Sequence, residues 1–563
     1  MSAEQAKKYF EIGLQFFKDK KLDLAQFNFE EALKLSPNRP SILQNLALVY
    51  FLRKNYTQAN EVLKNLENQN FFNDDLRELK FKILRNLKKT EELSEFLNNN
   101  KNFTDSSYFY KTFNELTYPD FFYDQSDIDQ SRKKIDESLE RLLNDPFKKL
   151  NLDKEVLEPP IFNLSYDQYD NLNINKKIVT LFRKIYPQLN QTLVSDKKNE
   201  KIKIGFFSEF FYDHTIGKLF KGIIFKLDRS IFDIVVFHSQ NTKKNSIYNE
   251  FLDAEIKIGL KNVNLDKDFT SKISLIAKEN LDIAFFPDIG MSTEFYYLSF
   301  VRFAKIQVTS WGHPITTANT SIDYFLSSIL LKSELDNKIF TEKILYLKNL
   351  PMYFYKPILN NPLIKKETTC KNLYFCSQSM VKFHPHFDLI LNKILSEDKK
   401  AKIYLIDNKK LGKKFKKRLK ENINQNFDRI NFLDRLSLEN YINECGRASV
   451  LIDTLYFGAG NSFHESMTYG TPTVTLPTQN LKSRIVMGAY KQMQIEDPPI
   501  CKDVDEYVFK ATEIANLNAN SILNLKYYYK DQAERYLFQN EELVEEINTL
   551  FIELYNKHEK TTL

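Results

Sequence analysis

The sequence of 563 residues predicts α-helical hairpins followed by a pair of Rossmann-like α/β domains that face a cleft. Two observations predict this architecture. The first 70 residues repeat small and aromatic positions at a spacing of 34, which is typical of stacked helical hairpins. From about residue 201 short apolar runs alternate with amphipathic segments, as in parallel βαβ units. The fold class is therefore α plus α/β.

Composition excludes several classes of protein. The formal net charge is only +6, with opposite charges interspersed, so we do not expect a nucleic-acid-binding protein. The four cysteines lack paired metal-ligand spacing, and we expect reduced thiols in a cytoplasmic protein. The N-terminus begins as a polar helix without a signal-peptide core, and no apolar run reaches the roughly 18 residues of a membrane span.

The repeat occupies residues 1–100. Pairs of similar residues lie 34 apart: Gly13 and Ala47, Phe16 and Tyr50, Ala25 and Ala59. This set resembles the tetratricopeptide (TPR) pattern, in which small residues let two antiparallel helices pack closely. A degenerate third hairpin is expected over 72–100. Such an array is a surface for a protein or peptide, although it could equally serve as a packing cap on the next domain.

Residues 101–200 are predicted to form a helical connector packed on both of its neighbours. The segment 126–145 places apolar residues on one helical face, and 175–189 gives another amphipathic helix. Between them, the sequence EPPIFNLSY breaks the helical pattern.

Two α/β lobes follow, over 201–360 and 361–540, and a C-terminal helix and tail over 541–563. Predicted strands of the first lobe are 201–208, 232–239, 281–288 and 305–312, and those of the second are 372–377, 401–406, 429–434, 448–453 and 471–476. A proline-punctuated linker over 350–369 separates the lobes. Two Rossmann-like lobes form the GT-B fold of nucleotide-sugar glycosyltransferases, an architecture shared by two-lobed epimerases and phosphorylases.

A glycine cluster follows the strand 448–453 in a chain that has only 13 glycines. Gly458 and Gly460 are expected to permit positive φ and close backbone approach to a ligand. The next helix is expected to begin near Ser462 with Asn461 as its cap. The amides of Asn461, Ser462 and Phe463 would then face a diphosphate, and Glu465, one turn on, would accept hydrogen bonds from ribose hydroxyls. An ordinary strand–helix turn is the alternative interpretation.

The stretch DTLYFGAGNSFHESMTYGTPTVTLP, followed by LKSRIVMGAY, resembles the C-terminal catalytic lobe of glycosyltransferase family 41. That family includes protein O-GlcNAc transferase, the Spindly O-fucosyltransferase and bacterial adhesin glycosyltransferases that modify asparagine. IGFFSEFFYDHTIGKL resembles its strand and loop with an active-site histidine, here His214. CSQSMVKFHPHFDLILNKIL resembles the segment whose lysine touches the donor diphosphate, here Lys382, with Gln378 or Ser379 near the family's glutamine.

The chain also departs from the family pattern. Gly460, Asn461 and Ser462 stand where the family has His-Thr-Thr, so one side-chain donor is missing, and Glu465 replaces the ribose-binding aspartate. Tyr441 replaces a histidine that stacks beside uracil. The sequence Gly-His-Pro at 312–314 replaces Gly-Tyr-Pro, which makes His313 a second choice, after His214, for contact with the acceptor or the sugar.

The remaining polar residues have structural alternatives. Asp288 is a possible base, although a loop cap explains it better; His464 has no assigned role; and Arg484 either helps to close the donor site or lies on the surface. The lysine-rich run 409–420 repeats Leu411, Phe415 and Leu419 at helical spacing, which indicates an amphipathic helix with a solvated lysine face. No DxD motif or clustered ligand set indicates a metal, so we expect neither a metal nor another cofactor.

The resemblance implies an inverting, metal-independent transferase that moves GlcNAc or a hexose from a UDP-sugar to Ser, Thr or Asn of a protein recruited by the TPR segment. Lys382 would stabilise the leaving diphosphate, Tyr441 would flank the base, and His214 would orient the sugar or the acceptor. A non-catalytic TPR scaffold and another GT-B activity, such as a UDP-sugar epimerase, remain the alternatives. UDP and GDP are both open as the donor's nucleotide.

Overall fold

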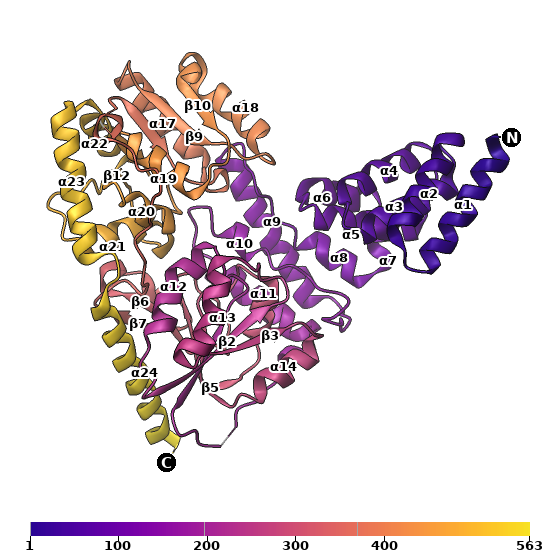
Figure 1. The fold of residues 1–563 in the computed structure, drawn as a ribbon, viewed down its shortest axis with the longest axis horizontal. Coiled ribbons are helices and arrows are strands. Elements are labelled where there is room, and N and C mark those ends of the chain that lie inside the picture. The colour runs from indigo at the N-terminus through magenta and orange to yellow at the C-terminus, as the bar shows by residue number, and fades with distance from the viewer. Residues whose placement is uncertain (1, 196, 369, 563) are drawn as a thin grey trace. The chain divides into compact units, whose positions relative to one another are not determined.

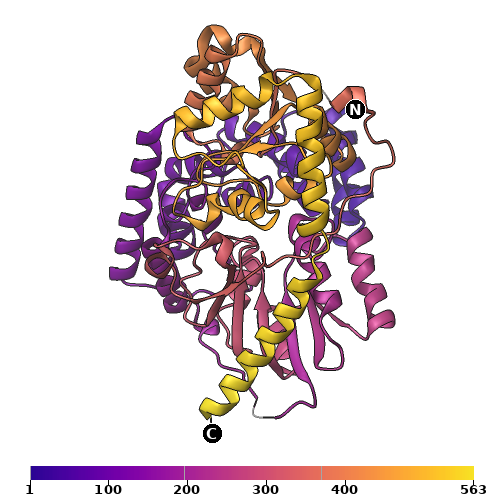
Figure 2. The same ribbon diagram turned by 90° about the vertical axis from the view of Figure 1, so that its left-hand side faces the viewer.

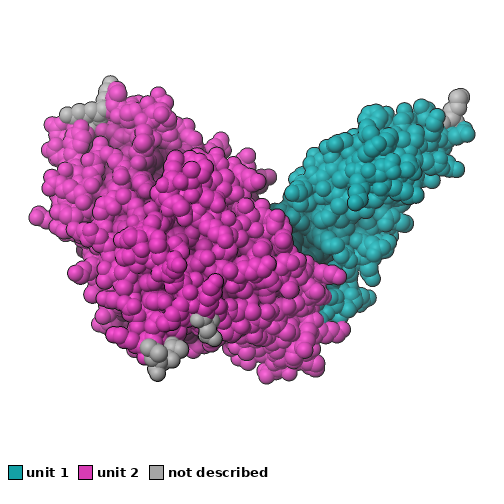
Figure 3. All heavy atoms as spheres, turned by 60° about the horizontal axis from the view of Figure 1, so that its bottom comes forward, with its two compact units in different colours: residues 1–120 teal, residues 121–563 magenta. Residues whose placement is uncertain are grey.

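The computed structural model describes residues 2–195, 197–368 and 370–562, and they form two compact units (Figure 3). The first unit ends at Asp120, beyond the predicted end of the repeats at residue 100, and the second begins at Phe121. No helix within the described ranges is long and apolar enough to cross a membrane.

The first unit consists of α-helices. Its helices are α1 (Ser2–Lys18), α2 (Leu22–Leu35), α3 (Pro40–Leu52), α4 (Tyr56–Asn68), α5 (Asp74–Asn86), α6 (Thr90–Asn99), α7 (Lys101–Ser106) and α8 (Tyr108–Glu115). Residues of the 34-residue repeat lie at the helix contacts, where Ala25, Ala47 and Ala59 are fully buried. A Cβ atom at Gly13 would lie 2.6 Å from the ring of Phe29, so the close packing of α1 on α2 requires glycine there. The predicted third hairpin is confirmed as α5 and α6.

The second unit opens with the connector helices and then the first lobe. The connector contains α9 (Gln125–Asn144), α10 (Ile161–Leu164) and α11 (Leu172–Ile185). The first lobe is a seven-stranded parallel sheet in the order β3-β2-β1-β4-β5-β6-β7. Its strands are β1 (Ile202–Phe207), β2 (Phe232–Ser239), β3 (Lys261–Leu265), β4 (Leu281–Phe286), β5 (Ala304–Ser310), β6 (Tyr324–Ser328) and β7 (Lys343–Leu347). Helices α12 (Thr215–Lys226), α13 (Ser246–Ile258), α14 (Phe269–Ala277), α15 (Thr293–Leu298) and α16 (Asp336–Ile339) connect them.

The second lobe is a five-stranded parallel sheet in the order β10-β9-β8-β11-β12. Its strands are β8 (Leu373–Cys376), β9 (Lys402–Ile406), β10 (Ile430–Leu433), β11 (Val450–Ile452) and β12 (Thr473–Val474). Its helices are α17 (Pro385–Glu397), α18 (Gly412–Ile423), α19 (Leu438–Arg447), α20 (Asn461–Ser466), α21 (Ile485–Gln492), α22 (Val504–Asn516) and α23 (Ala519–Tyr536). The lysine-rich run forms α18 as predicted, with Leu411, Phe415 and Leu419 buried.

Every strand predicted from the sequence is confirmed, but three strands were missed. These are β3, β6 and β7, and their sequences are KNVNL, YFLSS and KILYL. β3 and β7 form the two edges of the seven-stranded sheet and keep several half-buried or exposed residues, so they lack the continuous apolar run that marks a central strand. β6 is buried but ends in two serines.

The last helix ties the two lobes together. Helix α24 (Glu541–Thr562) follows α23 of the second lobe but runs back along the first lobe (Figures 1 and 2). Its Phe551 ring packs edge-on against Phe232 and Phe285 of the first sheet, and Glu559 pairs with Lys305 of β5 at 2.7 Å. The C-terminal segment predicted as a helix and tail is therefore a strap on the first lobe.

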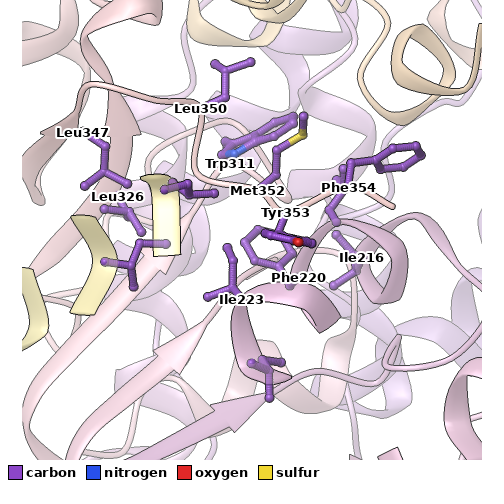
Figure 4. Close-up of a cluster of buried hydrophobic side chains, with 14 of the residues drawn as sticks. Ile216, Phe220, Ile223, Trp311, Leu326, Leu347, Leu350, Met352, Tyr353 and Phe354 are labelled. Atoms are coloured by element: carbon purple, nitrogen blue, oxygen red, sulfur yellow. The ribbon is translucent and has the colours of Figure 1, made fainter. Parts of the chain in front are cut away.

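One apolar core extends from the first lobe into the second. Figure 4 shows part of it, where Trp311, Tyr353 and Phe354 meet residues of α12. The same core includes Phe463 of α20 and Tyr490 of α21, which belong to the second lobe. The two lobes therefore meet through a closely packed hydrophobic contact.

A buried ion pair joins two helices of the second lobe. Asp388 on α17 and Arg418 on α18 are 0% and 3% exposed, and both carboxylate oxygens accept from the guanidinium at 2.8 Å. Two further donors of Arg418 bond the carbonyls of Phe122 and Phe383, so four of its five N–H groups have partners. This arrangement also fixes the start of the connector on the second lobe.

Candidate functional site

A cavity of about 720 Å³ opens between the two lobes of the second unit. It lies at the carboxyl ends of both parallel sheets, where ligands bind in folds of this kind. Its lining includes all the predicted site residues except Phe463: His214, His313, Gln378, Ser379, Lys382, Tyr441, Gly460, Asn461, Ser462 and Glu465. Residues predicted from separate motifs are thus brought to one place.

Lys382 lies at the centre of a polar network that joins two loops of the second lobe. Its Nζ donates to Gln378 Oε1 at 2.8 Å and to the Gly458 carbonyl at 3.0 Å. Gln378 Nε2 in turn donates to Ser462 Oγ at 2.7 Å. Burial lowers the pKa of Lys382 to about 8, although Asp453 opposes the shift. Within the described residues the ammonium donates only to these neutral acceptors, which leaves its charge available to an anion.

Asp453, at the end of β11, organises the glycine loop. Its carboxylate accepts from the Ala459 amide at 2.7 Å and from Thr475 Oγ1 at 2.9 Å. A Cβ atom at Gly458 would lie 2.8 Å from this carboxylate, so glycine is required there by close approach. The expectation of positive φ at Gly458 and Gly460 is wrong: Gly460 has φ −113°, and the left-handed residue of the loop is Tyr456 at +60°.

Helix α20 begins one residue earlier than predicted and is only six residues long. Gly460 is its N-cap, so Asn461 is not the cap but the first helical residue. Asn461 Oδ1 is buried and has no hydrogen-bond partner among the residues that the structure describes. The first-turn amides of Asn461 and Ser462 remain suited to an anion, whereas a helix this short contributes little macrodipole.

Phe463 does not belong to the cavity. Its amide donates to the Gly460 carbonyl at 3.0 Å, and its side chain is 1% exposed within the core shared by the lobes. The prediction assumed that three amides point outward, but the tight turn at Gly460 uses the third one internally.

Glu465 is held by a residue that the sequence reasoning missed. Lys218 on α12, in the other lobe, lies 3.0 Å from Glu465 Oε1 and 3.4 Å from Asp213 Oδ1. Lys218 also lines the cavity. Lys218 lies in the first turn of α12, four residues after the N-cap His214, and this spacing was the available signal. A ligand that uses the carboxylate of Glu465 has to share it with Lys218.

His214 caps the N-terminus of α12. Its Nδ1 accepts from the Ile216 amide at 3.4 Å, and its ring stacks on Phe210 with centroids 4.4 Å apart. Burial, with a contribution from the Lys218 charge, lowers the pKa of His214 to about 4. The ring is therefore neutral at physiological pH.

His313 follows β5 and is almost completely buried. Its Nδ1 lies 2.9 Å from the Ile289 carbonyl, and burial lowers its pKa to about 4. Its ring lies nearly parallel to Phe162, with centroids 5.9 Å apart. Gly290, at φ +109°, gives the imidazole room, because a Cβ atom there would lie 2.5 Å from Nδ1.

The connector supplies an aromatic wall that the sequence reasoning did not identify. Phe162 on α10 and Tyr166 just after it line the cavity, and Tyr166 packs on Phe457 of the glycine loop with centroids 4.9 Å apart. Lys482 Nζ holds this segment by donating to the carbonyls of Asp167 and Tyr169. The connector, which was predicted only to pack on its neighbours, therefore also contributes to the site.

Tyr441 on α19 also lines the cavity. It is accompanied by Ile406, Asn408, Arg435 and Leu438. Its ring lies 6.3 Å from that of Phe375, and burial raises the pKa of its hydroxyl well above the usual value. A flat ring beside aliphatic side chains is suitable for stacking on a base.

Three other polar residues considered from the sequence do not line the cavity. Asp288 accepts from Ser208 Oγ at 3.1 Å, and burial raises its pKa to about 8. His464 Nδ1 bonds the Gly460 carbonyl at 2.9 Å, and Arg484 donates to the Lys332 carbonyl. All three support loops around the site. The described residues contain no group of three or more His, Cys, Asp or Glu that could hold a metal ion.

No protein-family model matches the sequence, and no curated protein matches it either. Among solved structures, a lysine-to-methionine mutant of O-GlcNAc transferase from Thermobaculum terrenum is similar, with a TM-score of 0.69 and 13% identity over 100% of this chain and 99% of that one. Partial likenesses include the lipopolysaccharide outer core galactosyltransferase WaaB (TM-score 0.41, 12% identity, 62% and 99% covered) and Anabaena HepE with UDP and glucose (0.39, 11%, 63% and 100%). The full-length likeness shows that this chain has the fold of an O-GlcNAc transferase, a GT-B pair of lobes behind helical hairpins.

Proposed function

We propose that this chain is an inverting glycosyltransferase that moves a sugar from a UDP-sugar to a protein acceptor without a metal ion. One observation carries the proposal. Lys382, Gln378 and Ser462 form a connected polar network in the interlobe cavity, beside the first-turn amides of α20. A lysine with neutral partners next to free amides suits a diphosphate better than it suits any other common group.

Catalysis follows from where negative charge develops. The acceptor attacks the anomeric carbon from the face opposite the diphosphate, while the bond to the diphosphate oxygen breaks and its electron pair stays on that oxygen. Lys382 and the amides of Asn461 and Ser462 stabilise this charge. Since they are already fixed by Gln378, Gly458 and the loop that Asp453 organises, little reorganisation accompanies the reaction.

We assign the ribose, the base and the sugar of the donor to other residues that line the cavity. Glu465 accepts from the ribose hydroxyls, and Tyr441 stacks on the base. The unpartnered Asn461 Oδ1 accepts from a sugar hydroxyl. The helical hairpins of the first unit recruit the protein acceptor.

Binding of a nucleoside diphosphate tests the proposal most directly. UDP at about 100 times its dissociation constant is expected to stabilise the protein by about 2.7 kcal/mol, because it binds only the native state. The measurement is the melting temperature with UDP, GDP, UMP and uridine. We expect UDP to give the largest increase and uridine almost none, since the network around Lys382 recognises phosphate. No increase with any nucleotide at millimolar concentration would contradict the proposal.

Donor binding is expected to weaken at high pH. The pKa of Lys382 is about 8 in the empty site, and a bound diphosphate raises it, so binding takes up a proton above pH 8. The dissociation constant of UDP should be nearly constant from about pH 7 to 8 and then rise by up to tenfold per pH unit. Titration calorimetry measures this dependence.

The matched control is Lys382→Gln. This variant should bind UDP more weakly than the wild type, and its dissociation constant for UDP should not change with pH over the same range. Lys482 also has a pKa of about 8, but it is present in both proteins and cancels in the comparison. A variant that kept the wild-type pH dependence would assign it to another group and remove Lys382 from the diphosphate site.

A further inference from the structure

The two histidines of the cavity have opposite hydrogen-bonding character. His214 Nδ1 accepts from the Ile216 amide, so its proton lies on Nε2, which is a donor. His313 Nδ1 lies 2.9 Å from the Ile289 carbonyl, and a carbonyl can only accept, so the proton of His313 lies on Nδ1. The Nε2 atom of His313 therefore carries an unshared pair.

The His313 ring is fixed from three sides. The Ile289 carbonyl holds Nδ1, the Phe162 ring covers one face, and Gly290 leaves just enough space beside the imidazole. The side chain is 2% exposed and lines the cavity. Such support gives a catalytic group a single orientation.

Nε2 of His313 has no hydrogen-bond partner within the described part of the chain, although it is buried. A buried acceptor without a partner is costly, by roughly 1–3 kcal/mol, and native structures contain few. An arrangement that fixes one nitrogen and leaves the other bare in a cavity is explained if a ligand hydroxyl supplies the missing hydrogen.

We propose that His313 Nε2 is the catalytic base that takes the proton from the attacking acceptor. The inference rests on the proposed sugar transfer and assigns one of its steps. The acceptor oxygen forms its bond to the anomeric carbon, the bond from that carbon to the diphosphate breaks, and the acceptor proton moves to Nε2. The resulting imidazolium is stabilised by its Nδ1–H bond to Ile289 and then releases the proton to solvent.

The surroundings favour a late proton transfer. Burial and the nearby Lys482 charge keep the His313 ring neutral, so the base is always in its active form near pH 7. Asp288, which precedes Ile289, is itself held in its protonated form at that pH by burial. A weak base removes the proton only once attack has made the acceptor oxygen strongly acidic.

His214 cannot take this role while its Nε2 carries a proton, and it is placed instead to donate to the sugar or the diphosphate.

Two variants of His313 separate basicity from position. Asparagine can keep the donor to the Ile289 carbonyl but removes Nε2, whereas glutamine can keep an oxygen near Nε2 without its basicity. The assay is release of UDP from UDP-GlcNAc and UDP-glucose, with water as the acceptor, together with the dissociation constant of UDP. We expect both variants to lose about 100-fold in kcat while UDP affinity stays within about twofold of wild type.

His238→Asn is the matched control, because His238 is equally buried, is bonded to Asn262 at 2.9 Å and does not line the cavity. It should keep the wild-type kcat. A His313→Ala variant gives a second measurement, since added imidazole should restore part of its lost kcat. The proposal is overturned by a kcat within about threefold of wild type in the asparagine variant, by loss of UDP affinity together with kcat, or by failure of imidazole to restore turnover. Absence of UDP binding or turnover in the wild type would instead count against the proposed function itself.

Discussion

Replacing Lys382 with methionine is expected to lower kcat about 100- to 1,000-fold, because it removes a preorganised positive charge from the leaving diphosphate. Lys382 Nζ donates hydrogen bonds to Gln378 Oε1 and to the Gly458 carbonyl, so the side chain is held in place before the anion binds. Methionine has a similar length and is apolar, and the buried position tolerates it sterically. The loss should therefore report the charge and not the volume.

The measurement is UDP release from a UDP-sugar at saturating donor. UDP affinity should fall less than kcat, since the charge on the diphosphate oxygen grows as its bond to the sugar breaks. Lys393→Met is the control: this lysine is on α17 of the same lobe, is half exposed and pairs with Asp505 on the surface. A Lys382→Met variant with a kcat within threefold of the control would remove Lys382 from the mechanism.

Replacing Asp388 with alanine should destabilise the second unit by about 3–5 kcal/mol, because the Arg418 guanidinium would remain buried without a counter-ion. Bonds to the carbonyls of Phe122 and Phe383 would keep the arginine in place, so it could not simply reach solvent. The measurement is the urea midpoint of the transition that belongs to this unit.

The double variant Asp388→Leu with Arg418→Met is expected to recover most of the lost stability, since apolar residues of similar volume can replace a buried pair. Asp505→Ala removes an exposed partner and should leave the midpoint unchanged. An Asp388→Ala midpoint equal to that of wild type would show that water reaches Arg418 and that the pair is not buried in solution.

The sequence predicts a strand wherever the strand is buried on both faces and therefore forms a continuous apolar run. The central strands β1, β4 and β8 are short apolar runs and were predicted for that reason, whereas the order of the strands is a finding of the structure. Edge strands such as β3 and β7 carry a weaker signal because one side of each faces solvent or a loop. Their number was therefore underestimated, although the fold class was not affected.

Residues of the candidate site could be predicted where they lie in a loop or helix directly after a predicted strand, as Lys382 and Glu465 do. Residues that enter the cavity from a distant segment of the chain could not be predicted. Phe162 and Tyr166 come from about 35 to 40 residues before the first lobe, and no local pattern relates them to the cleft. Phe463 was wrongly included because the exact first turn of α20 depends on the bond from its amide to Gly460, which a sequence pattern does not specify.

The aromatic wall from the connector has a consequence for how the proposed functions are divided along the chain. The wall is fastened to the second lobe by Lys482 and to the first by Asn175, which donates to the Thr316 carbonyl, and the connector that carries it belongs to the same compact unit as the two lobes. All the residues that line the cavity therefore lie within the unit that begins at Phe121. The proposed recruitment of an acceptor and the proposed sugar transfer would thus be carried by two different units of the chain.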